Sequence, residues 1–148
     1  MSENTDAKKP SALQRGIIER ALMGSLFLAA GVGHFVAPAG FIAIVPKFIP
    51  GAAFWVYATG VFELILGAGL FTKWATRRFG LAVIALLILV YPANIWMAIE
   101  GTQIPGLAPV PSWVAWARLP LQFVMMWLVL RGTKKNEEAL AIAPRTAP

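Results

Sequence analysis

Four long apolar blocks alternate with short polar or proline-rich segments along the chain. These blocks cover residues 17–36, 51–71, 79–99 and 113–130. Each is close to the ~20 residues that a helix needs to cross a bilayer, where a helix satisfies its own backbone hydrogen bonds. The pattern predicts an all-α integral membrane protein, a bundle of four transmembrane helices. We expect a polar N-terminal tail at 1–15, a transmembrane domain at 16–131 and a C-terminal tail at 132–148.

The composition agrees with a membrane protein. Hydrophobic residues make up 58% of the 148 residues and charged residues 14%, against about 25% charged residues in ordinary soluble domains. A chain of this length has more apolar surface than one soluble core can bury. The composition therefore argues against a soluble domain and against a disordered chain.

The positive charges predict the orientation in the membrane. Eleven of the 13 Lys and Arg residues lie near the chain ends or in the loop between the second and third blocks. By the positive-inside rule, both termini lie in the cytoplasm, and the expected location is the bacterial inner membrane. The net charge of +6 is scattered between apolar blocks, which argues against binding of nucleic acid. Glu19 and Arg20, near the start of the first block, are expected to extend to the lipid headgroups.

The segments outside the blocks carry few charges. Residues 38–50 contain several apolar side chains at helical spacing and one charge, Lys47, so we expect a short segment in the membrane interface. Residues 101–112 contain three prolines and are expected to form a stiff, extended connection. We read the first block as an uncleaved span, because a polar tail precedes it. We expect the C-terminal tail to fray after Lys135.

Six polar side chains, distributed over the four apolar blocks, form the candidate site. An ionisable residue within a span is costly and marks a functional site by default. Glu63 lies on a stripe of small residues with Gly60 and Gly67, a surface that lets helices approach closely. Depth along each span places the polar groups together in the outer half of the bundle, and Arg118 is long enough to reach toward Glu63. The candidate residues are His34, Glu63, Tyr91, Asn94, Arg118 and Gln122.

A purely structural role for these residues is an alternative. Glu63 and Arg118 would neutralise each other and set the helix register, and this interpretation is weighted equally with a ligand site. Taken alone, His34, Tyr91 and Asn94 are better explained as ordinary hydrogen-bonding residues between helices. Their convergence at one depth favours a shared site.

The remaining counts exclude several chemistries. The chain has no cysteine and a single histidine, so it cannot form thiolate metal sites, iron–sulfur clusters or a haem site with two histidines. It contains no phosphate-binding, dinucleotide-binding or hydrolase motif. No metal, haem or nucleotide cofactor is expected, and a quinone is the cofactor that the polar groups could bind.

Five ordered motifs resemble the DoxX family of small bacterial membrane proteins. They are GVGHFVAP at 31–38, IVPKFIP at 44–50, GVFELILG at 60–67, YPANIWMA at 91–98 and RLPLQ at 118–122. The resemblance implies a four-helix membrane bundle. Relatives in that family are associated with quinone-linked oxidoreductase assemblies, methylamine utilisation and oxidative-stress complexes. Because this chain has no cysteine, it cannot by itself accept sulfur as a persulfide.

Three functions follow as hypotheses. The favoured one is an accessory or anchoring subunit of a quinone-linked membrane redox system, with no enzyme activity of its own. The second is a small proton-coupled transporter that uses Glu63 as a protonatable group. The third is a structural or assembly protein. The expected partners are the lipid bilayer and either a redox partner protein or further copies of the chain.

Overall fold

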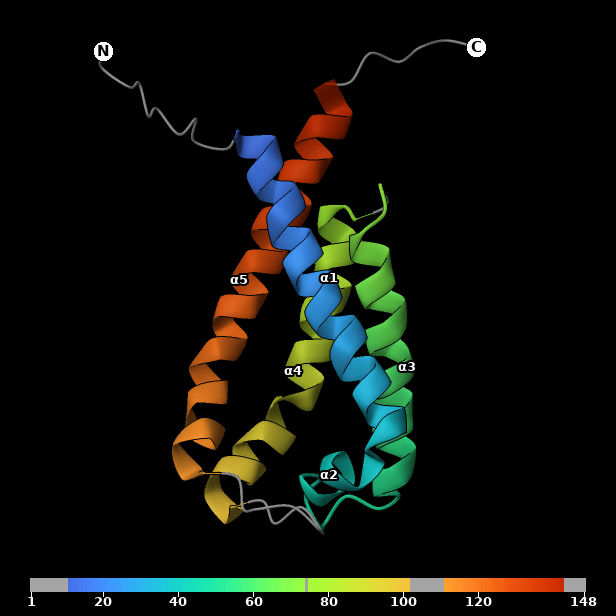
Figure 1. Ribbon diagram of the computed structural model, residues 1–148, viewed down its shortest axis with the longest axis vertical. Helices are drawn as coiled ribbons and strands as arrows, with labels where there is room; N and C mark the ends of the chain where they lie inside the picture. The colour runs from blue at the N-terminus through green and yellow to red at the C-terminus, as the bar shows by residue number, and fades with distance from the viewer. Residues whose placement is uncertain (1–10, 74, 102–110, 143–148) are drawn as a thin grey trace, which may run out of the picture.

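The described part of the chain folds into four long helices and one short one (Figure 1). The computed structural model describes residues 11–73, 75–101 and 111–142. The helices are α1 (Ala12–Val36), α2 (Pro38–Ala43), α3 (Ala52–Leu70), α4 (Arg77–Glu100) and α5 (Ser112–Ile142). Four of them are long and apolar enough to cross a membrane. The expectation of an all-helical protein with four candidate spans is confirmed; the expected conformations of residues 1–10 and 102–110 lie outside the described residues.

Local sequence signals explain where several helices begin and end. The Ser11 side chain accepts a hydrogen bond from the Gln14 backbone, and the Gln14 side chain accepts one from the Ser11 backbone, which is the reciprocal capping box. Pro38 stands in the first turn of α2, where its missing N–H is not needed. Gly51, just before α3, has a φ of 71°, a left-handed conformation that side chains disfavour.

Glycines bring α1 and α3 into close contact. A Cβ atom added to Gly67 would lie 3.0 Å from the Leu28 backbone nitrogen and 3.1 Å from the Gly24 carbonyl oxygen. A Cβ atom added to Gly31 of α1 would lie 3.0 Å from the Gly60 carbonyl oxygen. The predicted stripe of small residues on α3 is therefore a helix-packing surface, as small residues are in membrane proteins.

The long helices form two pairs. In one pair α1 packs along α3, and in the other α4 packs along α5; the pairs are joined mainly where α1 crosses α5. Contacts between α3 and α4 are sparse, and Figure 1 shows the α4–α5 pair leaning away from α1 and α3 at the end opposite the termini. The main core, including Met23, Leu70, Val83 and Val129, lies in the half that carries the termini.

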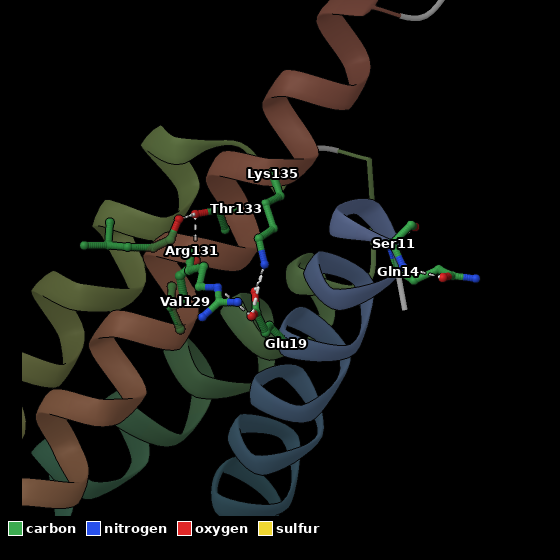
Figure 2. A network of polar contacts seen from close by, with 8 residues as sticks. Ser11, Gln14, Glu19, Val129, Arg131, Thr133 and Lys135 are labelled. Atoms are coloured by element: carbon green, nitrogen blue, oxygen red, sulfur yellow. Dashed lines mark hydrogen bonds and ion pairs between the residues drawn. The ribbon is translucent and has the colours of Figure 1, made fainter. Parts of the chain in front are cut away.

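A group of ionic contacts joins α1 to α5 near the termini (Figure 2). The Glu19 carboxylate lies 2.9 Å from Arg131 Nε and 3.1 Å from Lys135 Nζ. The neighbouring Arg20 donates to the carbonyl oxygens of Leu70 and Thr72 at 3.3 and 3.0 Å. These two carbonyl groups lie at and just beyond the C-terminal end of α3. The expectation that Glu19 and Arg20 extend to the headgroups is wrong, because both are buried and both find partners inside the protein.

The last helix continues well beyond the predicted span. α5 has 31 residues, about 46 Å at the usual rise per residue, and a hydrocarbon core is about 30 Å thick. The Asn136 amide donates to the carbonyl oxygens of Lys73 and Ala75 at 3.2 and 3.1 Å, and Glu137 accepts a hydrogen bond from the Arg77 backbone. The prediction that the chain frays after Lys135 is therefore wrong up to residue 142. Contacts with the loop after α3 hold this part of the helix.

Replacing Asn136 with alanine is expected to lower the free energy of unfolding by about 2 kcal/mol, because two hydrogen bonds of roughly 1 kcal/mol each are lost. The measurement is reversible unfolding in detergent, followed by circular dichroism. Glu138→Ala is the matched control, since Glu138 is exposed and its contact with Lys134 is long, at 3.7 Å, and exposed pairs contribute little. Equal effects of the two substitutions would contradict the role assigned to Asn136.

Candidate functional site

A cavity of about 720 Å³ lies in the half of the bundle opposite the termini. All five helices contribute to its lining, which is mostly apolar. The segment after α2 lines it through Ile44, Val45, Pro46 and Ile49. Sequence analysis predicts an interfacial segment here, and the structure adds that this segment forms a wall of the cavity. The polar side chains of the lining are His34, Thr59, Glu63, Asn94, Arg118 and Gln122.

His34 and Glu63 face each other across the α1–α3 contact. His34 Nε2 lies 3.3 Å from Glu63 Oε2. The other ring nitrogen, Nδ1, lies 2.7 Å from the Val56 carbonyl oxygen, and the Phe41 ring stacks on the imidazole with centroids 3.9 Å apart. The close approach of α1 to α3 at Gly60, where an added Cβ would meet His34 Cβ at 2.7 Å, brings the two side chains within reach. The imidazole is thus held on three sides.

Asn94 and Gln122 join α4 to α5 at the other side of the cavity. Asn94 Nδ2 donates to Gln122 Oε1 at 2.8 Å. Gln122 Nε2 in turn donates to the Leu87 carbonyl oxygen. Pro92 lies inside α4 and has no N–H to donate to the Ile88 carbonyl one turn earlier, so the helix is perturbed next to the Leu87 carbonyl. Gln122 is almost fully buried, so its amide is committed to this contact and holds Asn94 in place.

Arg118 lines the cavity but does not pair with Glu63. Its side chain is exposed, and no hydrogen bond or ion pair joins it to any residue of 11–73, 75–101 or 111–142. The expectation that Arg118 reaches Glu63 is wrong. The reason is the pairing of the helices: α3 packs on α1 and α5 packs on α4, so the nearest partner of Glu63 is His34.

Tyr91 is the one candidate residue that does not line the cavity. Its ring packs edge-on against Phe123 of α5, with centroids 5.6 Å apart. The structure brings the other five candidates, His34, Glu63, Asn94, Arg118 and Gln122, to one cavity. Sequence analysis missed the stacking of Phe41 on His34. The sequence signal for this contact is the helical spacing of apolar residues after Pro38. That spacing indicates a short helix but not the side chain on which Phe41 packs.

A comparison with known protein families matches most of the described chain. Residues 23–132 match the family described as a domain of unknown function, DUF8561. The chain belongs to the DUF8561 family. The match runs from α1 into α5 and includes every polar residue that lines the cavity. No curated protein and no solved structure matches the chain.

The DUF8561 domain has no cluster suited to a metal ion in its described part. Among those residues, no three His, Cys, Asp or Glu side chains come together. What the cavity offers is a set of hydrogen-bonding groups on apolar walls. Asn94 has a second amide hydrogen that Gln122 does not use, and Arg118 has five N–H donors. A flat, mostly apolar molecule with a few oxygen atoms fits this chemistry.

Proposed function

We propose that the protein is an accessory or anchoring subunit of a membrane redox system and that it binds a quinone in the cavity of its DUF8561 domain. The observation that carries the proposal is the cavity of about 720 Å³ with apolar walls and hydrogen-bond donors on facing helices. This volume lies within the range of 300–1,000 Å³ that is typical of small-molecule sites.

The chemistry of a quinone matches the two kinds of surface. A quinone ring has two carbonyl oxygens that accept hydrogen bonds, and an apolar tail that dissolves in lipid. Asn94 and Arg118 supply donors, and the surrounding walls of Leu, Val, Ile and Met side chains accept the ring. The resemblance of the sequence to the DoxX family, whose relatives are associated with quinone-linked assemblies, supports the same proposal.

The arrangement in the membrane is part of the proposal. Both termini lie on the cytoplasmic side of a bacterial inner membrane, as the distribution of positive charges indicates. The cavity then lies in the outer half of the bilayer. A quinone enters it from the lipid, between the α1–α3 pair and the α4–α5 pair, where contacts between α3 and α4 are sparse.

Filling the cavity tests the proposal. Ala93 lines the cavity, and Ala93→Phe is expected to weaken quinone binding by at least about tenfold, because the ring occupies the space of the ligand. Ala85→Phe is the matched control, since Ala85 lies on the same helix with an exposed side chain and outside the cavity. Binding of a short-chain ubiquinone analogue in nanodiscs is followed by quenching of tryptophan fluorescence, because Trp55 lines the cavity.

A second measurement addresses the redox system. The tagged protein is purified from its native membrane in mild detergent, and bound quinone and co-purifying proteins are identified by mass spectrometry. We expect stoichiometric quinone and a redox enzyme with the wild type and the Ala85→Phe protein, and loss of the quinone with Ala93→Phe. The proposal would be overturned if the wild type showed no saturable quinone binding in nanodiscs and no quinone co-purified with it. Proton flux into liposomes would then favour the transporter hypothesis.

A further inference from the structure

The hydrogen bond at Nδ1 determines the tautomer of His34. In a neutral ring, the nitrogen that faces Glu63 carries no proton. The Val56 carbonyl oxygen can only accept a hydrogen bond, so at 2.7 Å the Nδ1 atom must carry a proton and donate it. In a neutral imidazole the other nitrogen, Nε2, is then an acceptor. Nε2 points at Glu63 Oε2, 3.3 Å away. An ionised carboxylate is also only an acceptor.

Two acceptors at this distance repel each other unless a proton lies between them. Glu63 Oε2 is buried and has no other hydrogen-bond partner among the described residues, so it cannot turn to a different donor without moving. A buried carboxylate oxygen without a hydrogen-bond donor is costly. One additional proton removes the conflict, either on Glu63 as a carboxylic acid or on His34 as an imidazolium.

We propose that His34 and Glu63 together form a proton-binding site that holds one exchangeable proton between Nε2 and Oε2 at the wall of the cavity. In the state with one proton the pair has no net charge, and on losing it the pair carries one negative charge. This inference goes beyond the quinone proposal and does not rest on it, because the ligand is the proton itself.

The charged surroundings leave the pair as the main acid–base group of the cavity. On α1, the other ionisable groups, Arg15, Glu19 and Arg20, lie toward the opposite end of the helix. α2 has none, and on the segment that follows it Lys47 is exposed. On α3 the Tyr57 side chain is exposed and packs on Phe35. On α4 Tyr91 packs on Phe123, and on α5 Arg118 lines the cavity without an acidic partner among the described residues.

The single histidine makes the test direct. Because the chain contains only one His, protein labelled with 15N-histidine gives one pair of ring signals, and 13C-labelled glutamate reports the carboxyl groups. In ligand-free nanodiscs at neutral pH we expect a protonated Nδ1. We also expect either a protonated Nε2 beside an ionised Glu63, or an Nε2 signal shifted by a hydrogen bond from a protonated Glu63.

Two results with the wild type alone would overturn the proposal. One is the opposite tautomer, with a proton on Nε2 and a bare Nδ1. The other is a neutral ring with a proton on Nδ1 beside an ionised Glu63. These spectra need no variant, so the test stands even where a substitution prevents folding. They also need no quinone, so failure here leaves the quinone measurements intact, and absence of quinone binding leaves this result intact.

A variant then assigns the proton to the pair. Glu63→Gln keeps the shape and can donate an amide hydrogen to Nε2, but it has no acidic proton. We expect the Nε2 signal to move downfield, toward an unprotonated ring nitrogen, while the Nδ1 signal stays in place. Glu100→Gln is the matched control, because Glu100 is exposed at the end of α4, and it should leave both signals unchanged. An Nε2 signal that is unaffected by Glu63→Gln would contradict the proposal.

Discussion

Replacing Gly67 with leucine is expected to force α1 and α3 apart and to cost about 3 kcal/mol of stability, the upper end of the 1–3 kcal/mol that overpacking of a tight core typically costs. At this position even a Cβ atom would lie about as close as the backbone allows, at 3.0 Å from the Leu28 nitrogen and 3.1 Å from the Gly24 carbonyl oxygen. Backbone atoms of a neighbouring helix cannot rotate away as a side chain can. The larger side chain can be accommodated only by moving a whole helix.

The neighbouring residue gives a matched control for the substitution at Gly67. Ala68 lies one position further along α3, and its side chain is exposed, so Ala68→Leu adds the same side chain without meeting α1. Unfolding in detergent, followed by circular dichroism and by retention of the folded peak in size-exclusion chromatography after heating, compares the two. Similar melting temperatures for the two variants would show that the close contact of α1 and α3 is not a main source of stability.

The elements of this fold follow from sequence because their causes are local. A run of about 20 apolar residues satisfies its own backbone only as a helix in lipid, and this predicts the four long helices. The stripe of Gly60 and Gly67 likewise predicts a close helix contact. The depth of His34, Glu63, Asn94, Arg118 and Gln122 along their helices follows from the rise per residue, and the structure brings these five to one cavity.

The partners of these residues depend on which helices are neighbours, and that is not a local property. The depth of Glu63 in the membrane would allow a contact with either His34 or Arg118. Because α3 packs on α1, Glu63 contacts His34. The same cause explains Glu19. From sequence it is a charge near the end of a span, and burial becomes acceptable only because α5 continues past the apolar block and supplies Arg131 and Lys135.

Replacing Glu19 with glutamine is expected to cost about 3 kcal/mol, because it removes the shared partner of Arg131 and Lys135 and leaves two cations facing each other. Removing one member of a buried ion pair costs 3–5 kcal/mol. The side chain of Arg131 is 38% exposed, which screens its charge and places the expectation at the lower end of that range.

The same ionic group allows a double-substitution test. Glu19→Gln combined with Lys135→Gln should be more stable than Glu19→Gln alone, because the second change removes an unpaired cation. Lys134→Gln is the matched control for Lys135, since Lys134 is exposed and its one ion pair among the described residues is with the exposed Glu138. Adding Lys134→Gln to Glu19→Gln should restore no stability. The melting temperatures of the wild type, the Glu19→Gln protein and the two double variants in detergent measure the difference. If the Lys135 and Lys134 combinations unfold alike, Glu19 is not held by Lys135, and the link between α1 and the extended end of α5 must rest on other contacts.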